Sequence, residues 1–221
     1  MAKAEYYDVV PGKNSYEFDV SGLMSKARAV SPRIIIITTP HNPTGAVISA
    51  SDLETIIKEN PSSLVIVDEA YLGFSEQKFD VRHLLAAYSN VVFSRTFSKL
   101  YGLAGIRVGY GLCAPMAKQV FRLDVNPFRV NNISRKMAVA ALRDEKYYKG
   151  LLKDITESRN FFITEMNSIP GVKAFDSAAN FVFIHFSENT DVQALKDYLA
   201  QNGYLVRLWT ERKQWKKLSL L

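Results

Sequence analysis

The sequence predicts an α/β fold with a mainly parallel sheet, followed by a smaller α+β unit. In the first half of the 221-residue chain, short apolar runs rich in β-branched residues alternate with segments of helical character. Such alternation is typical of buried parallel strands joined by helices. Polar residues follow each run directly, and ligands of such sheets bind at the carboxyl ends of the strands. The runs are residues 34–37, 64–67 and 91–94.

Helical patterns separate these runs. Residues 24–30 form a weak pattern and residues 81–88 a short one. The clearest helix follows the loop 38–45, in which two prolines and a glycine act as breakers. Ser51 with Glu54 three residues later is the pattern of a capping box, and the apolar residues around them recur at helical spacing. We therefore expect a helix that starts at Ser51. The run 34–37 has the composition of a strand buried on both faces.

The second half has longer helices and strands of alternating character. This change predicts two units, residues 1–149 as a partial large domain and residues 150–221 as a small α+β domain. The expected elements are a helix over 115–123, a loop over 124–132, helical structure over 134–167 with a break near Lys149 and Gly150, strands over 172–175 and 181–185, a helix over 190–201 that stops at Gly203, and a last strand over 204–208.

Composition is that of an ordinary globular protein, with 48% hydrophobic and 23% charged residues. The single cysteine, Cys113, excludes an internal disulfide framework and fits a reducing compartment. We expect no signal peptide in the first residues, no membrane-spanning stretch and a cytoplasmic location. His41, His83 and His185 are dispersed without metal-ligand spacing, so they are interpreted as surface or turn histidines and no metal is expected.

The net charge of +6 raises the possibility of nucleic-acid binding. Its distribution argues against that function. Residues 207–221 hold five basic residues and one glutamate, a net of +4, which leaves +2 over the rest of the chain. The basic character therefore belongs to the tail, and we expect neither a nucleic-acid nor a membrane partner. Salt-sensitive oligonucleotide binding that is lost on deletion of residues 209–221 would revive the nucleic-acid hypothesis.

The segment 91–111 carries the strongest chemical signal. Lys99 lies just past a buried strand, where loss of water would disfavour its charged form, and Arg107 would add to this by repulsion if the fold brings the two together. A neutral lysine is a nucleophile that forms a Schiff base with an aldehyde. Thr96, Ser98 and Arg107 are groups that would hold a phosphate beside it. An aldehyde that carries a phosphate suggests pyridoxal phosphate as the cofactor.

The residues 94–110, Ser-Arg-Thr-Phe-Ser-Lys-Leu-Tyr-Gly-Leu-Ala-Gly-Ile-Arg-Val-Gly-Tyr, resemble the lysine motif of the class I/II aminotransferases of fold type I. Among these, the chain is most similar to histidinol-phosphate aminotransferases. The resemblance implies that Lys99 is both the Schiff-base partner of pyridoxal 5'-phosphate and the base that moves the substrate proton. It also carries over Thr96, Ser98 and Arg107 as phosphate ligands, although a threonine after a strand is often only a cap.

Two further motifs support the resemblance. In Val-Asp-Glu-Ala-Tyr, residues 67–71, Asp68 would pair with the ring nitrogen of the cofactor, and Tyr71 would donate to its phenolic oxygen. Asn42, in His-Asn-Pro-Thr-Gly, would donate to the same oxygen. Each has a plain alternative. Asp68 could cap the turn after its strand, Tyr71 could pack under a loop, and Asn42 could be a turn residue before proline.

The resemblance spans roughly residues 15–208 of a family whose chains are longer, so we expect a chain truncated at both ends. The absent parts would include the glycine/serine phosphate loop, the aromatic that stacks on the cofactor ring and the tyrosine lent across the dimer. At the carboxyl end, an atypical basic tail over 209–221 stands where the family has a strand with a carboxylate-binding arginine.

The predicted function is transfer of an amino group between a small-molecule amino donor, either an amino acid or a histidinol-phosphate-like amine, and a 2-oxo acid acceptor, through a lysine Schiff base. The family resemblance implies a homodimer. Two alternatives remain open. One is a related enzyme of the threonine-phosphate decarboxylase type, which shares these motifs, and the other is a truncated, non-catalytic remnant of the family.

Overall fold

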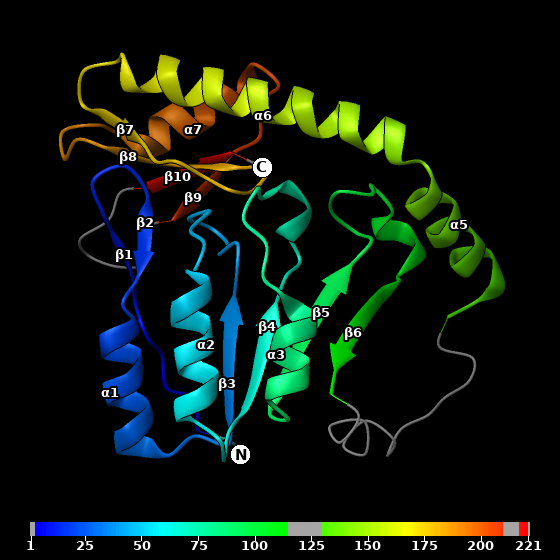
Figure 1. Ribbon diagram of the computed structural model, residues 1–221. Coiled ribbons are helices and arrows are strands. Elements are labelled where there is room, and N and C mark those ends of the chain that lie inside the picture. Colours follow the sequence, from blue (N-terminus) through cyan, green and yellow to red (C-terminus); the bar gives the residue numbers. More distant parts are fainter. Residues whose placement is uncertain (1–2, 115–129, 210–216, 221) are drawn as a thin grey trace.

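The structure is a computed structural model that describes residues 3–114, 130–209 and 217–220 (Figure 1). Its first large sheet has the strand order β3-β4-β5-β6. The first three strands are parallel and β6 runs antiparallel to β5, which confirms the mainly parallel sheet predicted from the sequence. The strands are β3 (Ile34–Thr38), β4 (Leu64–Asp68), β5 (Val91–Thr96) and β6 (Gly109–Cys113).

Helices α1 (Val20–Val30), α2 (Ala50–Glu59) and α3 (Val81–Ala87) cover one face of this sheet. The predicted helices are confirmed at α1, which starts four residues earlier than expected, and at α3. Their apolar sides pack on alternate strand residues because successive side chains of a strand point to opposite faces. The strand residues of this core are Ile35, Ile37, Val65, Val67, Val91 and Phe93.

The start of α2 differs from the prediction. Ser49 is its N-cap, and the Ser49 Oγ accepts a hydrogen bond from the Asp52 backbone N–H at 3.0 Å. The predicted capping box at Ser51 and Glu54 is wrong, because Ser49 and Asp52 repeat the same pattern of a hydroxyl and an acid and Ser49 has the extended backbone that a cap requires. Glu54 instead accepts a hydrogen bond from the Tyr88 hydroxyl at 3.0 Å.

The opposite face of the sheet, here called the outer face, is only partly covered by the described residues. Ile34 and Ile36 are 54% and 58% exposed, and their register partners Leu64 and Ile66 are half-buried. Within the described ranges, none of these four belongs to an apolar cluster. The prediction that 34–37 is buried on both faces is therefore wrong. All three helices lie on the other side of the sheet, and they bury only its alternate residues.

A second sheet lies above the first in Figure 1, with the order β7-β8-β10-β9 and antiparallel pairing throughout. The prediction of a last strand over 204–208 is wrong in two respects: the bounds of that strand differ, and it is not the last strand. Pairing with β10 fixes β9 at Arg207–Trp209, and β10 (Lys217–Leu220) follows it within the predicted tail. The other elements of this unit are β7 (Val172–Ala174), β8 (Val182–Phe186) and α7 (Val192–Gln201). Gly203, with φ of 86°, follows the end of α7, as predicted.

Two helices, α5 (Asn132–Arg143) and α6 (Glu145–Asn167), lead from the first sheet to the second (Figure 1). The break is at Asp144, and α6 runs without interruption through Gly150, so the predicted break near 149–150 is wrong. Asp144 ends one helix and caps the next, because its carboxylate accepts a hydrogen bond from the Tyr147 N–H at 3.3 Å.

The helix expected over 115–123 and most of the loop expected over 124–132 lie outside the described residues. No helix in the described part of the chain is long and apolar enough to cross a membrane. The remaining short elements are β1 (Val9–Pro11), β2 (Tyr16–Phe18) and the 3-10 turns η1 (Leu72–Phe74) and η2 (Ala104–Ile106).

Tyr16 in β2 joins the amino-terminal hairpin to the second sheet. Its ring packs edge-on against Phe175 and Phe183, and its hydroxyl lies 2.6 Å from His185 Nε2. The interpretation of His185 as a surface or turn histidine is therefore wrong, since it lies within β8 and in this aromatic cluster.

We predict that Tyr16→Phe lowers the free energy of unfolding by about 1 kcal/mol, because it removes one hydrogen bond and keeps the ring packing. Urea denaturation measures the change. His185→Phe should then cost less in the Tyr16→Phe background than in wild type, since the bond is already gone. Additive losses from the two substitutions would contradict a direct interaction.

Candidate active site

The carboxyl ends of β3, β4 and β5 bring polar residues side by side. In the parallel register, Asp68 lies between Thr38 and Ser94. The Asp68 Oδ1 accepts hydrogen bonds from the Ala70 N–H at 3.0 Å and from the Ser94 hydroxyl at 3.5 Å. The first bond is the turn-capping contact expected of an aspartate at a strand end. By strand alternation, Asp68 and Ser94 lie on the outer face.

Asn42 and Tyr71, from the loops that follow β3 and β4, meet directly. The Asn42 side-chain amide donates to the Tyr71 hydroxyl at 2.9 Å. Tyr71 is buried, and its ring packs edge-on against Phe181, with the centroids 5.0 Å apart. The aromatic packing fixes the ring and the amide fixes the hydroxyl. The two residues that the resemblance assigned to one cofactor oxygen are thus adjacent.

Lys99 lies in the turn that follows β5, with its Nζ 5.0 Å from the centre of the Tyr71 ring. Ammonium groups over aromatic faces are attracted by the ring quadrupole. The prediction that Lys99 loses water is wrong, because its side chain is exposed. The turn lies beyond the carboxyl end of β5. Its Leu100 packs against the Tyr71 cluster, and the Tyr101 ring packs against Tyr148 in α6. Asn42, Tyr71 and Lys99 form one chain of contacts.

The three predicted phosphate ligands lie around the β5–β6 hairpin. The Thr96 Oγ1 accepts a hydrogen bond from the Ser98 N–H at 3.0 Å, which is the capping role that sequence alone left open. A bond from the Phe97 N–H to the Val108 carbonyl extends the pairing of β5 and β6, and so brings the Ser98 and Arg107 ends of the hairpin together. Arg107 is exposed and left-handed at φ of 55°, and it donates to the Ala104 carbonyl at 2.9 Å.

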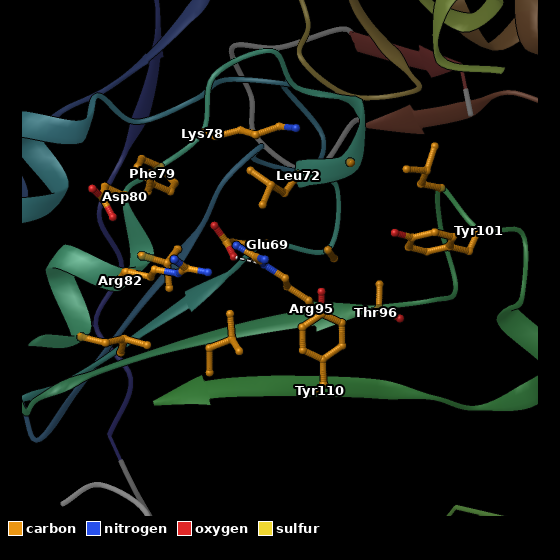
Figure 2. A pocket seen from close by; sticks show the side chains of 16 residues that line it. Glu69, Leu72, Lys78, Phe79, Asp80, Arg82, Arg95, Thr96, Tyr101 and Tyr110 are labelled. Atoms are coloured by element: carbon orange, nitrogen blue, oxygen red, sulfur yellow. Dashed lines mark hydrogen bonds and ion pairs between the residues drawn. The ribbon is translucent and has the colours of Figure 1, made fainter. Parts of the chain in front are cut away.

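A buried ion pair beside this site was missed by the sequence reasoning. The Arg95 Nε donates to Glu69 Oε2 at 2.6 Å, and the Glu69 side chain is fully buried. The pair lines a pocket of about 620 Å³. In Figure 2, Tyr110 lies beneath Arg95, and Thr96 and Tyr101 lie to one side. Burial raises the pKa of Glu69, and the guanidinium offsets part of that rise.

The pairing register of β4 and β5 would have predicted this ion pair. Asp68 and Ser94 are paired across β4 and β5, so the residues that follow them, Glu69 and Arg95, come next to each other on the inner side. Of the seven predicted site residues, Thr96 alone lines this pocket of the described structure. The predicted residues are thus gathered at one edge, where Asn42, Lys99 and Arg107 are exposed.

His41 is a half-buried turn residue, as predicted, and its Nδ1 lies 2.9 Å from the Thr44 hydroxyl. Burial lowers its pKa to about 4. Between pH 4 and 6.5 the unfolded chain therefore binds more protons at this site than the folded chain does, and acidification favours unfolding.

We predict that lowering the pH through this window costs wild type about 2 kcal/mol more unfolding free energy than it costs His41→Asn. The comparison cancels the titration of other groups, and asparagine retains a polar partner for Thr44. Chemical denaturation at several pH values measures it. Parallel pH curves for the two proteins would show that His41 is not held neutral by the fold.

The parallel sheet with polar side chains at its carboxyl edge defines an α/β protein of the ligand-binding kind. The Lys99 amine, the Asp68 carboxylate and the hydroxyl groups of Ser94 and Thr96 lie at or just beyond that edge. A family model described as aminotransferase class I and II matches residues 1–214. The chain belongs to this family.

Known relatives agree with that assignment. The chain is 32% identical over 195 residues to the histidinol-phosphate aminotransferase of Thermoanaerobacter sp. (strain X514), covering 88% of this chain and 54% of the relative. The structure is similar to that of histidinol-phosphate aminotransferase from Sinorhizobium meliloti in complex with pyridoxal-5'-phosphate, with a TM-score of 0.80 and 28% identity over 92% of this chain and 57% of that one.

L-threonine-O-3-phosphate decarboxylase from Porphyromonas gingivalis also matches, with a TM-score of 0.72 over 85% of this chain and 58% of that one. At 20% identity this likeness concerns the fold alone. The chain spans about half the length of the curated relatives it matches.

Proposed function

We propose that the chain acts in a pyridoxal-phosphate-dependent aminotransferase that moves an amino group from a histidinol-phosphate-like amine to a 2-oxo acid. The observation that carries the proposal is the placement of Lys99 over Tyr71, whose hydroxyl is held by Asn42. The similarity to the Thermoanaerobacter enzyme and to the Sinorhizobium meliloti complex supports it.

The side chains present fit this cofactor. An aldehyde requires an amine, which Lys99 provides, and a pyridine nitrogen requires a carboxylate, which Asp68 provides at the strand end. The phenolic oxygen and the phosphate of the cofactor also have suitable partners at the same edge. The Asn42–Tyr71 pair offers hydrogen-bond donors to a phenolic oxygen, and the hairpin of Ser98 and Arg107 offers hydroxyl and guanidinium groups to a phosphate. Bound pyridoxal phosphate supplies an electrophilic carbon and a ring that withdraws electrons.

The residues of the chain then have separate tasks. Lys99 would hold the cofactor at rest and would take or return the proton of the substrate carbon. Asp68 would keep the ring nitrogen protonated, because a carboxylate next to that nitrogen stabilises its cationic form. Tyr71 and Asn42 would stabilise negative charge on the phenolic oxygen. Arg107 would anchor the phosphate and so fix the orientation of the ring.

An assay of the two possible reactions tests this function. The protein with pyridoxal phosphate is given histidinol phosphate and a 2-oxo acid in one reaction, and threonine phosphate in another. The proposal predicts a new amino acid in the first reaction and no carbon dioxide in the second. Release of carbon dioxide without amino transfer would favour the decarboxylase type instead.

A second candidate is a non-catalytic member of the family. It is favoured by the exposure of Asn42, Lys99 and Arg107 in the described structure. In that case pyridoxal phosphate binds at Lys99, but neither amino transfer nor carbon dioxide release is observed.

The proposed function extends to the partners, oligomeric state, location and domains of the protein. We propose small-molecule donor and acceptor partners, a homodimer and a cytoplasmic location. We also propose a large domain over residues 1–149 and a small one over 150–221. The contact of Tyr16 with β8 joins the two. Size-exclusion chromatography with light scattering tests the dimer.

A further inference from the structure

A second pocket, of about 660 Å³, lies where the first-sheet unit meets the second-sheet unit. Its walls come from β2, from the start of α2 and the segment before it, from residues 74–77, from α6 and from residues 176–178. None of the seven predicted cofactor residues lines it. Whatever this pocket binds is therefore held apart from the candidate active site.

Arg159 of α6 is the one basic residue that lines this pocket. Its Nη1 donates to the Ala179 carbonyl at 2.8 Å, but its Nε is buried without a hydrogen-bond partner in the described structure. Burial lowers the pKa of its guanidinium, and the nearby carboxylates of Glu76 and Asp176 offset part of that effect. Buried charges in proteins are normally paired. Arg159 thus has the capacity for a further anionic partner.

Ser75 is a second polar group of the wall without a partner. The residue is only 6% exposed, and its Oγ has no hydrogen-bond partner among the described residues. Its neighbour Phe74 belongs to the same apolar cluster as Ala179, whose carbonyl Arg159 holds. Buried polar groups are rarely left unsatisfied, so a ligand or water beside Arg159 is the expected acceptor for this hydroxyl.

The rest of the lining indicates the kind of ligand. Glu76 and Asp176 are exposed carboxylates from the two different units, and the rings of Tyr16, Phe18 and Phe74 line the same pocket. We propose that the pocket binds a free α-amino acid with an apolar side chain, its carboxylate paired with Arg159 and its ammonium group toward Glu76 and Asp176.

Main-chain contacts fix the two halves of the pocket against each other. The Ala178 N–H donates to the Gly45 carbonyl at 3.0 Å, and the Asp176 N–H donates to the Asn14 carbonyl at 2.8 Å. Gly45 has a φ of 73°, and a Cβ at this position would overlap Ser177. The pocket is thus formed before a ligand arrives, which reduces the entropy lost on binding.

Isothermal titration calorimetry of the full chain with L-phenylalanine tests the proposal, in the absence of pyridoxal phosphate. Two analogues are titrated in parallel: 3-phenylpropionate lacks the ammonium group, and phenethylamine lacks the carboxylate. We expect saturation at one L-phenylalanine per chain and weaker binding of both analogues. Equal or tighter binding of either analogue would overturn the assignment of an amino-acid site.

Arg159→Met should weaken the binding of L-phenylalanine at least about tenfold, because the ligand carboxylate loses its half-buried partner. Glu76→Gln/Asp176→Asn changes only exposed carboxylates, so it should fold normally and weaken binding about two- to fivefold. Arg135→Met is the matched control, since Arg135 is exposed on α5 and lies outside the pocket. It should bind as wild type does. Thermal melts of all three variants check folding.

Absence of saturable binding by wild type would overturn the proposal. So would binding of wild-type strength by Arg159→Met or, if that variant does not fold, by the double variant. Lys99→Ala should bind L-phenylalanine as wild type does, because Lys99 does not line the pocket. Loss of binding in that variant would place the ligand at the candidate active site instead. The titrations contain no cofactor, so their failure is distinct from failure of the proposed aminotransferase function.

Discussion

Replacing Lys99 with alanine is expected to lower amino transfer by about 10²- to 10⁴-fold, the usual contribution of a positioned acid–base group. The substrate proton then has no amine to accept it at the carboxyl edge. Because Lys99 is exposed, the same change should leave the melting temperature unaltered. Steady-state kinetics and a thermal melt on the same preparation measure the two effects.

Lys153→Ala is the matched control for that substitution. Lys153 is an exposed lysine on α6 whose contact is a surface ion pair with Glu157 at 3.8 Å. Its loss should change neither rate nor stability. If Lys99→Ala retains amino transfer within threefold of wild type, Lys99 is not the group that moves the proton.

Replacing Arg95 with methionine is expected to lower the free energy of unfolding by about 3–5 kcal/mol at neutral pH, the cost of leaving a buried charge unpaired. Glu69 would remain fully buried without its guanidinium. The deficit should shrink as the pH falls. An unpaired buried carboxylate has a raised folded-state pKa, so the folded state of the variant binds a proton before the unfolded state does. Urea denaturation at neutral and acidic pH measures both effects.

The double variant Glu69→Gln/Arg95→Met provides the control, because it removes the stranded charge together with its partner. It should be more stable than Arg95→Met alone. A deficit in Arg95→Met that does not change with pH, or a double variant that is still less stable, would contradict a direct ion pair as the source of the loss.

Much of the first sheet could be predicted from the sequence. The runs at 34–37, 64–67 and 91–94 have few other stable arrangements than parallel strands, and parallel strands bring their carboxyl ends to one edge. That reasoning places Asn42, Asp68 and Lys99 near one another. The contact of Asn42 with Tyr71 is consistent with the family resemblance, whereas strand periodicity alone does not indicate it.

Other features depend on pairing that a single sequence does not reveal. The Glu69–Arg95 pair requires the register of β4 against β5. The exposure of Lys99 and of Ile36 depends on what covers the sheet rather than on the strands themselves. The strand β10 was not predicted, because its sequence resembles a basic tail. Its pairing with β8 and β9 on either side identifies it as a strand.

Two helix boundaries were predicted wrongly because neighbouring residues compete for the same capping role. Ser49 and Ser51 are both competent caps, and at the later break Asp144 competes with the more conspicuous Gly150. Backbone geometry decides between such neighbours, and side-chain type alone does not.

The most direct test of the proposed lysine site is a borohydride trap followed by peptide mapping. The protein is mixed with pyridoxal phosphate at low concentration, reduced and digested, and the mass of the cofactor is located along the chain. The proposed site predicts modification confined to Lys99 and its loss in Arg107→Ala, which lacks the phosphate anchor. Labelling spread over many exposed lysines, or equal labelling of Lys99 in Arg107→Ala, would contradict the site.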